Sequence, residues 1–175
     1  MDLKKYIRSI PDYPQKGILF RDITTLIKDK NAFKNCIDQM SNIIITLDYD
    51  IIAAIESRGF IFASPLSYNL SKSHILLRKK NKLPAEKYSM DFELEYGKAT
   101  LEIHKDSISS KERVIIVDDL IATGGTAEAA AKLVKKSGGE VAGFIFVINL
   151  FDLGGKKLLE KNGYKSYSIM DFPGH

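Results

Sequence analysis

The sequence has a single cysteine, no tryptophan and no hydrophobic run long enough to cross a membrane. The lone Cys36 excludes an internal disulfide framework and favours a reducing compartment. The longest apolar stretch, at 141–151, is far shorter than the roughly 20 residues that a transmembrane helix needs. Residues 1–13 lack the apolar core of a signal peptide. We therefore expect a cytoplasmic protein without a membrane partner, in which Cys36 is a packed structural thiol.

A strong charge of one sign is also missing. The formal net charge is +4, which suits a small anionic ligand but is too weak to indicate a nucleic-acid partner. No repeat, low-complexity segment or linker interrupts the 175 residues. A chain of this length can bury a substantial core, so we expect one domain over 1–175.

What the sequence does contain is an alternation of apolar runs and helical patterns. Runs of branched apolar residues predict strands, the last of them at an edge, over 50–56, 74–79, 114–119, 141–150 and 164–170. Helical spacing predicts helices over 31–47, from 62 onward, over 126–139 and over 154–163. We expect Asp29 or Asn31 to cap the first helix and Thr126 the third. This order is typical of an α/β fold with a mainly parallel central sheet flanked by helices.

The segment 87–106 differs from the rest because it is highly charged and alternates apolar and polar residues only in places. This pattern predicts a hairpin or a long flexible loop over the edge of the sheet. We do not expect it to contribute to the core.

The most informative stretch is VIIVDDLIATGGT at 114–126, an apolar strand that ends in two aspartates and is followed by a glycine turn. Backbone N–H groups of a Thr-Gly-Gly-Thr turn at a helix N-terminus can bind a phosphate, and the hydroxyls of Thr123 and Thr126 can add donors. The turn matches neither the Walker A pattern nor the dinucleotide fingerprint.

The paired carboxylates of Asp118 and Asp119 need a different partner from the phosphate turn. Sugar hydroxyls bind acceptors, so a ribose 5-phosphate would satisfy both features at once. The alternative is that the two aspartates only end a strand and that the glycines only form a tight turn.

This stretch resembles the signature of the type I phosphoribosyltransferases, enzymes that use phosphoribosyl pyrophosphate (PRPP). Three further stretches, GILFRDIT (17–24), IESRGFIF (55–62) and LEYGKATLEIHKD (94–106), resemble the adenine phosphoribosyltransferases, and the likeness runs from about Tyr6 to Met170. It implies a homodimer that makes AMP and pyrophosphate from adenine and PRPP, with Mg²⁺ held through PRPP and not by the protein alone. It also implies a small hood at about 1–30 and a flexible loop at about 85–105.

The resemblance further implies roles for individual residues. The adenine ring would stack on Phe20 and meet the backbone of Leu19 and Arg21. Glu95 would exchange a proton with the base, Tyr96 would cover the sugar, and Arg58 would complete the catalytic set. The pyrophosphate would bind Arg58, Arg78, Lys79 and Lys82, and the ribose 5-phosphate would bind Asp118, Asp119, Ala122, Thr123, Gly124, Gly125 and Thr126. It also maps a cis peptide onto the Glu56–Ser57 bond.

Alternatives remain for several of these assignments. Leu19 and Phe20 could be core residues, and the lysines after 77 could be a solvated charged run. Asn149 stands where the family pattern has a glutamate, which leaves the base contacts near Leu150 uncertain. A transferase for another purine base and a non-catalytic PRPP-sensing regulator are the competing functions.

Overall fold

The computed structural model describes residues 1–94 and 97–175. In that part of the chain the main sheet has seven strands in the order β5-β6-β4-β3-β7-β8-β9. The strand bounds are β3 Ile51–Ile55, β4 Ser73–Lys79, β5 Lys87–Leu94, β6 Gly97–His104, β7 Arg113–Ile121, β8 Glu140–Leu150 and β9 Ser166–Phe172. The helices are the 3-10 helix η1 Leu3–Tyr6 and α1 Thr24–Lys28, α2 Lys30–Ile44, α3 Gly59–Leu70, α4 Gly125–Lys136 and α5 Gly155–Lys161.

Strands β4, β3, β7, β8 and β9 are parallel, which confirms the predicted α/β fold. The chain passes from β3 to β4 on one side and later returns to β7 on the other side of β3. Where the connections after two adjacent strands run to opposite sides, a crevice forms beyond the carboxyl ends of these strands. This crevice is the usual ligand site of an open parallel sheet. The fold therefore directs attention to the residues that follow β3 and β7.

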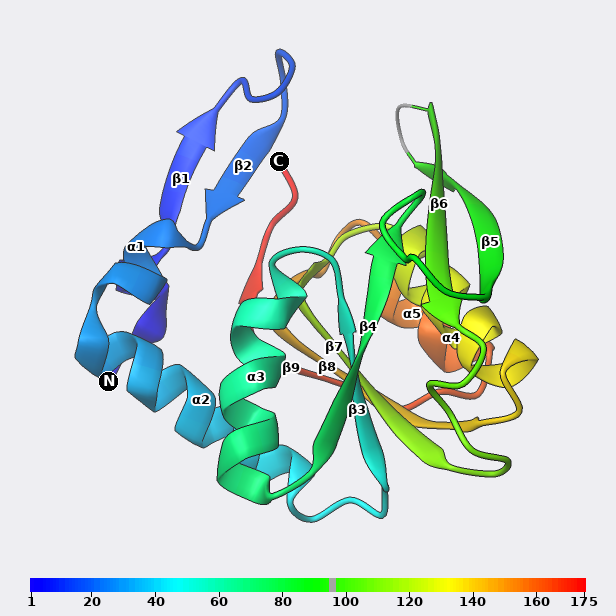
Figure 1. Cartoon of the computed structure of the whole chain (residues 1–175). Coiled ribbons are helices and arrows are strands. Elements are labelled where there is room, and N and C mark those ends of the chain that lie inside the picture. Colours follow the sequence, from blue (N-terminus) through cyan, green and yellow to red (C-terminus); the bar gives the residue numbers. More distant parts are fainter. Residues whose placement is uncertain (95–96) are drawn as a thin grey trace.

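Helices cover both faces of the sheet (Figure 1). On one face α2 and α3 bury Met40, Phe62 and Leu66 against the sheet. On the other face α4 buries Ala130 and Leu133. Because successive strand residues point to opposite faces, each buried strand contributes to both cores. Cys36 is fully buried in the first core, and burial raises its pKa to about 12, so the predicted packed thiol is confirmed.

The helix starts agree only partly with the expected caps. Asp29 caps α2 by accepting hydrogen bonds from the N–H groups of Asn31 and Ala32, as predicted. The prediction for Thr126 is wrong, because α4 begins at Gly125 and its N-cap is Gly124, two residues before Thr126 and without a side chain that could form a capping hydrogen bond. Gly124 has a φ of +91°, a left-handed conformation that glycine adopts without a steric penalty.

The segment 87–106 contains the β5–β6 hairpin, so the hairpin prediction is confirmed. The expectation that it stays out of the core is wrong, because Leu101 and Ile103 of β6 are buried. Strand β6 pairs antiparallel with β4, and this pairing makes the hairpin an extension of the main sheet. One face of the hairpin is buried because α4 packs against β5 and β6, which explains the alternation of apolar and polar residues.

The N-terminal residues form a separate two-stranded sheet from β1 Arg8–Pro11 and β2 Leu19–Asp22. This hairpin extends away from the main sheet, and the end of the chain marked C lies beside it (Figure 1). Arg8 of β1 forms an ion pair with the buried Asp22 of β2, which fixes the base of the hairpin. Within the described residues, no helix combines the length and hydropathy needed to span a membrane.

Candidate active site

A cavity of about 580 Å³ lies beyond the carboxyl ends of β3 and β7. Its volume falls in the range of small-molecule sites. Residues from several separate segments of the chain line it, among them Phe20, Glu56, Ser57, Arg58, Lys79, Phe92, Leu94, Asp118, Asp119, Ala122, Thr123, Gly124, Gly125 and Thr126. Most of the residues predicted to bind PRPP therefore meet in one cavity.

The two aspartates lie at the end of β7, where they face the segment that follows β3. The Nε of Arg58 is 3.0 Å from Oδ2 of Asp119, whose side chain is almost completely buried. The segment after β3 can lie this close to β7 only because residue 59 is a glycine. A Cβ on Gly59 would lie 2.8 Å from the carbonyl oxygen of Val117 in β7. Close packing against β7 thus requires a glycine at the third position of the Ser-Arg-Gly sequence after β3. The Glu56–Ser57 peptide is cis, as the resemblance implied.

Both aspartates are held in an environment that disfavours their ionised form. Burial raises the pKa of Asp118 well above its usual value, and the adjacent Asp119 raises it further. Burial also raises the pKa of Asp119, although the neighbouring Arg58 opposes this effect. The site therefore contains two carboxyl groups with little solvation and one cation close to them. A ligand that supplies hydroxyl donors or additional positive charge would stabilise the ionised form of these two carboxyl groups.

The glycine turn lies next to the aspartates, at the N-terminus of α4. The first N–H groups of a helix have no partner within the helix, and here they open into the cavity that Thr123 and Thr126 also line. A Cβ on Gly125 would lie 2.8 Å from the carbonyl oxygen of Glu93 at the end of β5. The hairpin therefore lies close against the turn, and Gly125 leaves the space for it.

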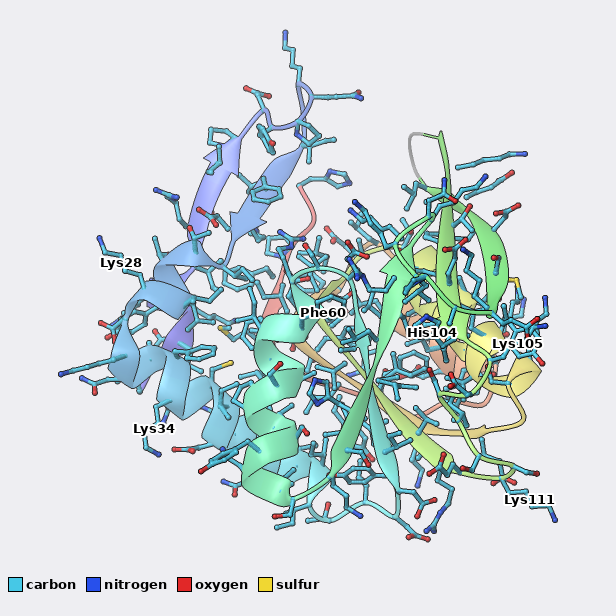
Figure 2. All side chains as sticks on the ribbon, viewed as in Figure 1. Lys28, Lys34, Phe60, His104, Lys105 and Lys111 are labelled. Atoms are coloured by element: carbon cyan, nitrogen blue, oxygen red, sulfur yellow. The ribbon has the colours of Figure 1, made fainter. Side chains whose placement is uncertain are left out.

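The basic segment, residues 78–82, begins with the last two residues of β4, and the fold divides its side chains. Lys79 lines the cavity, whereas Arg78 and Lys82 do not. The Nε of Arg78 donates to Oε2 of Glu56 at 2.9 Å, and its guanidinium lies 6.0 Å above the ring of Phe60. Figure 2 shows Phe60 at the N-terminal end of α3. The side chain of Arg78 thus contacts Glu56 and Phe60 and does not face the cavity.

Two acids that the sequence analysis did not assign hold the backbone of this basic segment. Oε2 of Glu56 accepts the N–H of Lys79 at 2.7 Å, and Oε2 of the buried Glu102 accepts the N–H of Asn81 at 3.0 Å. Burial would raise the pKa of Glu56, but Arg78 and the N–H of Lys79 outweigh it and lower the pKa. The position of Glu56 directly before Ser57–Arg58 was the available sequence signal for this residue.

The residues predicted to contact adenine line a second, smaller cavity of about 150 Å³ that shares Phe20, Arg58, Leu120 and Ala122 with the first. Leu19 and Arg21 line it as well. The ring of Phe20 lies 5.5 Å from the guanidinium of Arg58 and 5.2 Å from the ring of Tyr13, so it is held from two sides. The alternative of Leu19 and Phe20 as core residues does not hold, since both are only partly buried.

Two further expectations concern the ends of strands. Asn149, the departure from the family pattern, is buried on β8 and donates to Oδ1 of Asp171 at 2.8 Å. A carboxylate therefore remains beside this position, supplied by β9. Glu95 and Tyr96, two of the three predicted catalytic residues, lie outside the described residues.

Comparisons with known proteins agree with this geometry. The model of the phosphoribosyl transferase domain family matches residues 23–173. The chain is 66% identical over 175 residues to the adenine phosphoribosyltransferase of Pelagibacter ubique, with 100% of both chains covered. The adenine phosphoribosyltransferase of Pelodictyon phaeoclathratiforme is 52% identical, with 99% of both chains covered.

Solved structures extend the likeness to three dimensions. The adenine phosphoribosyltransferase of Thermoanaerobacter pseudethanolicus aligns with a TM-score of 0.93 and 47% identity, covering 98% of each chain. The enzyme of Saccharomyces cerevisiae, in a complex that contains adenine, aligns with a TM-score of 0.88 and 34% identity over 97% of each chain. The chain therefore belongs to the phosphoribosyltransferase family and, within it, to the adenine phosphoribosyltransferases.

Proposed function

We propose that this protein transfers the 5-phosphoribosyl group of PRPP to adenine, giving AMP and pyrophosphate in purine salvage. The observation that carries the proposal is the junction of two cavities at Phe20 and Arg58. One cavity has the groups that a ribose 5-phosphate and a pyrophosphate require. The other is smaller and lined largely by apolar side chains, as a planar base requires.

Asp118 and Asp119 accept the hydroxyls of the ribose in this proposal, and Ala122–Thr126 bind its 5-phosphate. Support comes from the adjacency of the acids and the glycine turn, which line the same cavity. The N-terminus of α4 favours the phosphate charge. The hydroxyl donors of the sugar relieve the poor solvation of the two carboxylates.

Arg58 and Lys79 bind the pyrophosphate and stabilise it as it leaves. Breaking the bond between ribose C1 and the pyrophosphate oxygen leaves positive charge on the ribose and negative charge on the leaving group, so fixed cations lower the barrier. Both residues line the cavity. In our proposal Arg78 and Lys82 act less directly, and their charge raises the local potential around the pyrophosphate.

Mg²⁺ fits the oxygen-rich side of this cavity. The ion usually binds one or two carboxylates together with substrate phosphates, and Asp118 and Asp119 line the cavity that would receive them. These residues would hold it through the oxygens of PRPP. When bound, it adds positive charge to the pyrophosphate.

Adenine stacks on Phe20, with the backbone of Leu19 and Arg21 at its edge. The likeness to the yeast enzyme, whose complex contains adenine, supports this choice of base over other purines. A backbone donor and acceptor can separate a 6-amino from a 6-oxo purine because the pattern is reversed between them. Glu95 then exchanges a proton with the base and Tyr96 covers the sugar, by resemblance alone.

The proposed homodimer has a candidate interface on α3 and β4. Ile61, Tyr68 and Leu76 are large apolar side chains that are 38%, 86% and 38% exposed. Ile61 and Tyr68 are seven residues apart and share one face of α3, and Leu76 is on the adjacent strand. Sedimentation of the wild type should give a dimer, and Tyr68→Glu should weaken it. A monomeric wild type would contradict this interface.

An assay of the purified protein with PRPP, Mg²⁺ and each purine base tests the function. We expect AMP and pyrophosphate from adenine, with far lower turnover of guanine, hypoxanthine and xanthine. Preferred turnover of a 6-oxo purine would replace adenine with another base. Binding of PRPP without any nucleotide product would indicate a PRPP-sensing regulator.

A further inference from the structure

Residues Phe172–His175, here called the wall segment, lie beside the smaller cavity. They begin at the last residue of β9 and turn toward the N-terminal hairpin, so the end of the chain marked C lies beside β2 (Figure 1). Gly174 and His175 line the cavity together with Leu19, Phe20 and Leu153. The wall segment is therefore part of the enclosure in which we place the base.

Arg21 holds the wall segment from the side of the hairpin. Its Nη2 donates to the carbonyl oxygen of Pro173 at 2.9 Å, and its Nη1 donates to Oγ of Ser9 at 2.6 Å. The guanidinium lies 4.8 Å above the ring of Phe172. Arg21 is only 6% exposed, so these contacts replace most of its hydration. The side chain of Arg21 thus binds protein groups, while only its backbone remains for the base edge.

The loop after β8 holds the wall segment from the opposite side. Oδ1 of Asp152 accepts the N–H of Gly174 at 2.7 Å, and the N–H of Phe151 donates to the carbonyl oxygen of Phe172 at 3.1 Å. A Cβ on Gly174 would lie 2.6 Å from Cγ of Leu153, so a larger residue would push the segment away. The wall segment is fixed on both sides of the cavity.

We propose that the wall segment is a specificity element of the base site and that Arg21 and Asp152 are positioning residues that act through it. This inference rests on the proposed function. His175, whose imidazole can donate and accept one hydrogen bond each, lines the same cavity as Phe20, on which the base stacks in our proposal. The element affects the base and not PRPP, because neither Gly174 nor His175 lines the larger cavity.

Removal of Gly174 and His175 tests the inference directly. The deletion begins after β9, so the main sheet stays complete, and a thermal melt checks this. We expect the KM for adenine to rise about tenfold, equivalent to ~1.4 kcal/mol, with the KM for PRPP unchanged. His175→Ala should give part of this rise. An unchanged KM for adenine in the deletion variant would overturn the inference.

Substitutions at Arg21 separate positioning from direct contact. Arg21→Met should raise the KM for adenine as the deletion does, and Arg21→Lys, which keeps one donor for Pro173, should restore part of the affinity. Combining Arg21→Met with the deletion should add little, because both remove the same wall. Fully additive effects would overturn the positioning role. A wild-type protein that makes no AMP would refute the proposed function itself, a result distinct from either of these.

Discussion

Arg58, which follows β3, and Asp119 of the neighbouring strand β7 form an ion pair, with Nε and Oδ2 3.0 Å apart. The arginine is partly exposed to the cavity, whereas the aspartate is buried. The same guanidinium lies above the ring of Phe20. One side chain therefore links the proposed ribose, pyrophosphate and base sites, and its removal should affect catalysis more than folding.

We expect Arg58→Met to lower kcat/KM for PRPP by about 10²–10³, the usual effect of removing one donor that stabilises developing negative charge. Steady-state kinetics would measure it. Arg113→Met is the matched control, because Arg113 pairs with Asp50 at the opposite end of β7, also 3.0 Å apart. A similar loss of kcat/KM in both variants would show that Arg58 stabilises the fold and does not act on PRPP directly.

Asp118→Asn should stabilise the protein while it abolishes PRPP use. The folded-state pKa of Asp118 is raised by burial and by Asp119, so its ionisation in the folded state is unfavourable. The wild type therefore loses stability as the pH rises from the ordinary pKa through the raised one. The gain in the free energy of unfolding of the variant over the wild type should be absent at low pH and should reach its full size above the folded-state pKa of Asp118. Thermal melts over a pH series would measure it, and a constant difference would contradict it.

The double variant Asp118→Asn with Asp119→Asn tests the ribose assignment. We expect a folded protein that no longer uses PRPP, because amide oxygens are weaker acceptors for sugar hydroxyls than carboxylates. Circular dichroism would check the fold, and AMP formation would check the activity. Normal turnover would refute the assignment.

Gly125→Ala should reduce activity by crowding the hairpin. The added Cβ would lie 2.8 Å from the carbonyl oxygen of Glu93, a backbone atom that cannot rotate away. Overpacking of this kind costs about 1–3 kcal/mol. We expect β5 to move away from the glycine turn to relieve it. We expect a lower kcat, measured with saturating substrates, and a melting temperature that falls by only a few degrees, about 2–4 °C per kcal/mol of this cost. Unchanged kcat would mean that the hairpin does not close on this turn during turnover.

Glu102→Ala should weaken PRPP binding although Glu102 is not among the residues lining the cavity. The substitution removes the carboxylate that accepts the N–H of Asn81, a hydrogen bond to a charged group that is worth about 1.5–3 kcal/mol, and releases the basic segment. Glu102→Gln keeps an acceptor and should retain most of the affinity. The exposed Glu86, which pairs with Lys105, provides the control Glu86→Ala. Equal KM values for PRPP in all three variants would exclude this positioning role.

Glu95→Ala should lower kcat more than it lowers PRPP affinity, since its proposed role is proton exchange with the base. General acid–base groups contribute about 10²–10⁴ in rate. Single-turnover kinetics together with PRPP binding would separate the two effects. An unchanged kcat would remove Glu95 from the chemistry.

Several features of this protein could be predicted from local patterns. The strand ending in Asp118 and Asp119 and the glycine turn behind it are adjacent in sequence, so their proximity in space required no long-range information. The buried strands were predicted because each is an apolar run between helical patterns. The cap of α4 was placed wrongly because Thr126 and Gly124 are both plausible caps, and only the backbone conformation distinguishes them.

By itself the sequence determined the α/β class, the glycine turn with its paired acids and, through resemblance, the family. Only the tertiary structure decided that Lys79 lines the larger cavity while Arg78 packs against Glu56, that Glu102 holds the basic segment, and that Arg21 fixes residues 172–175 beside the smaller cavity. The physical reason is sequence separation. Arg21 and Pro173 are 152 residues apart, and contacts over such distances follow from how the sheet and the hairpin pack together.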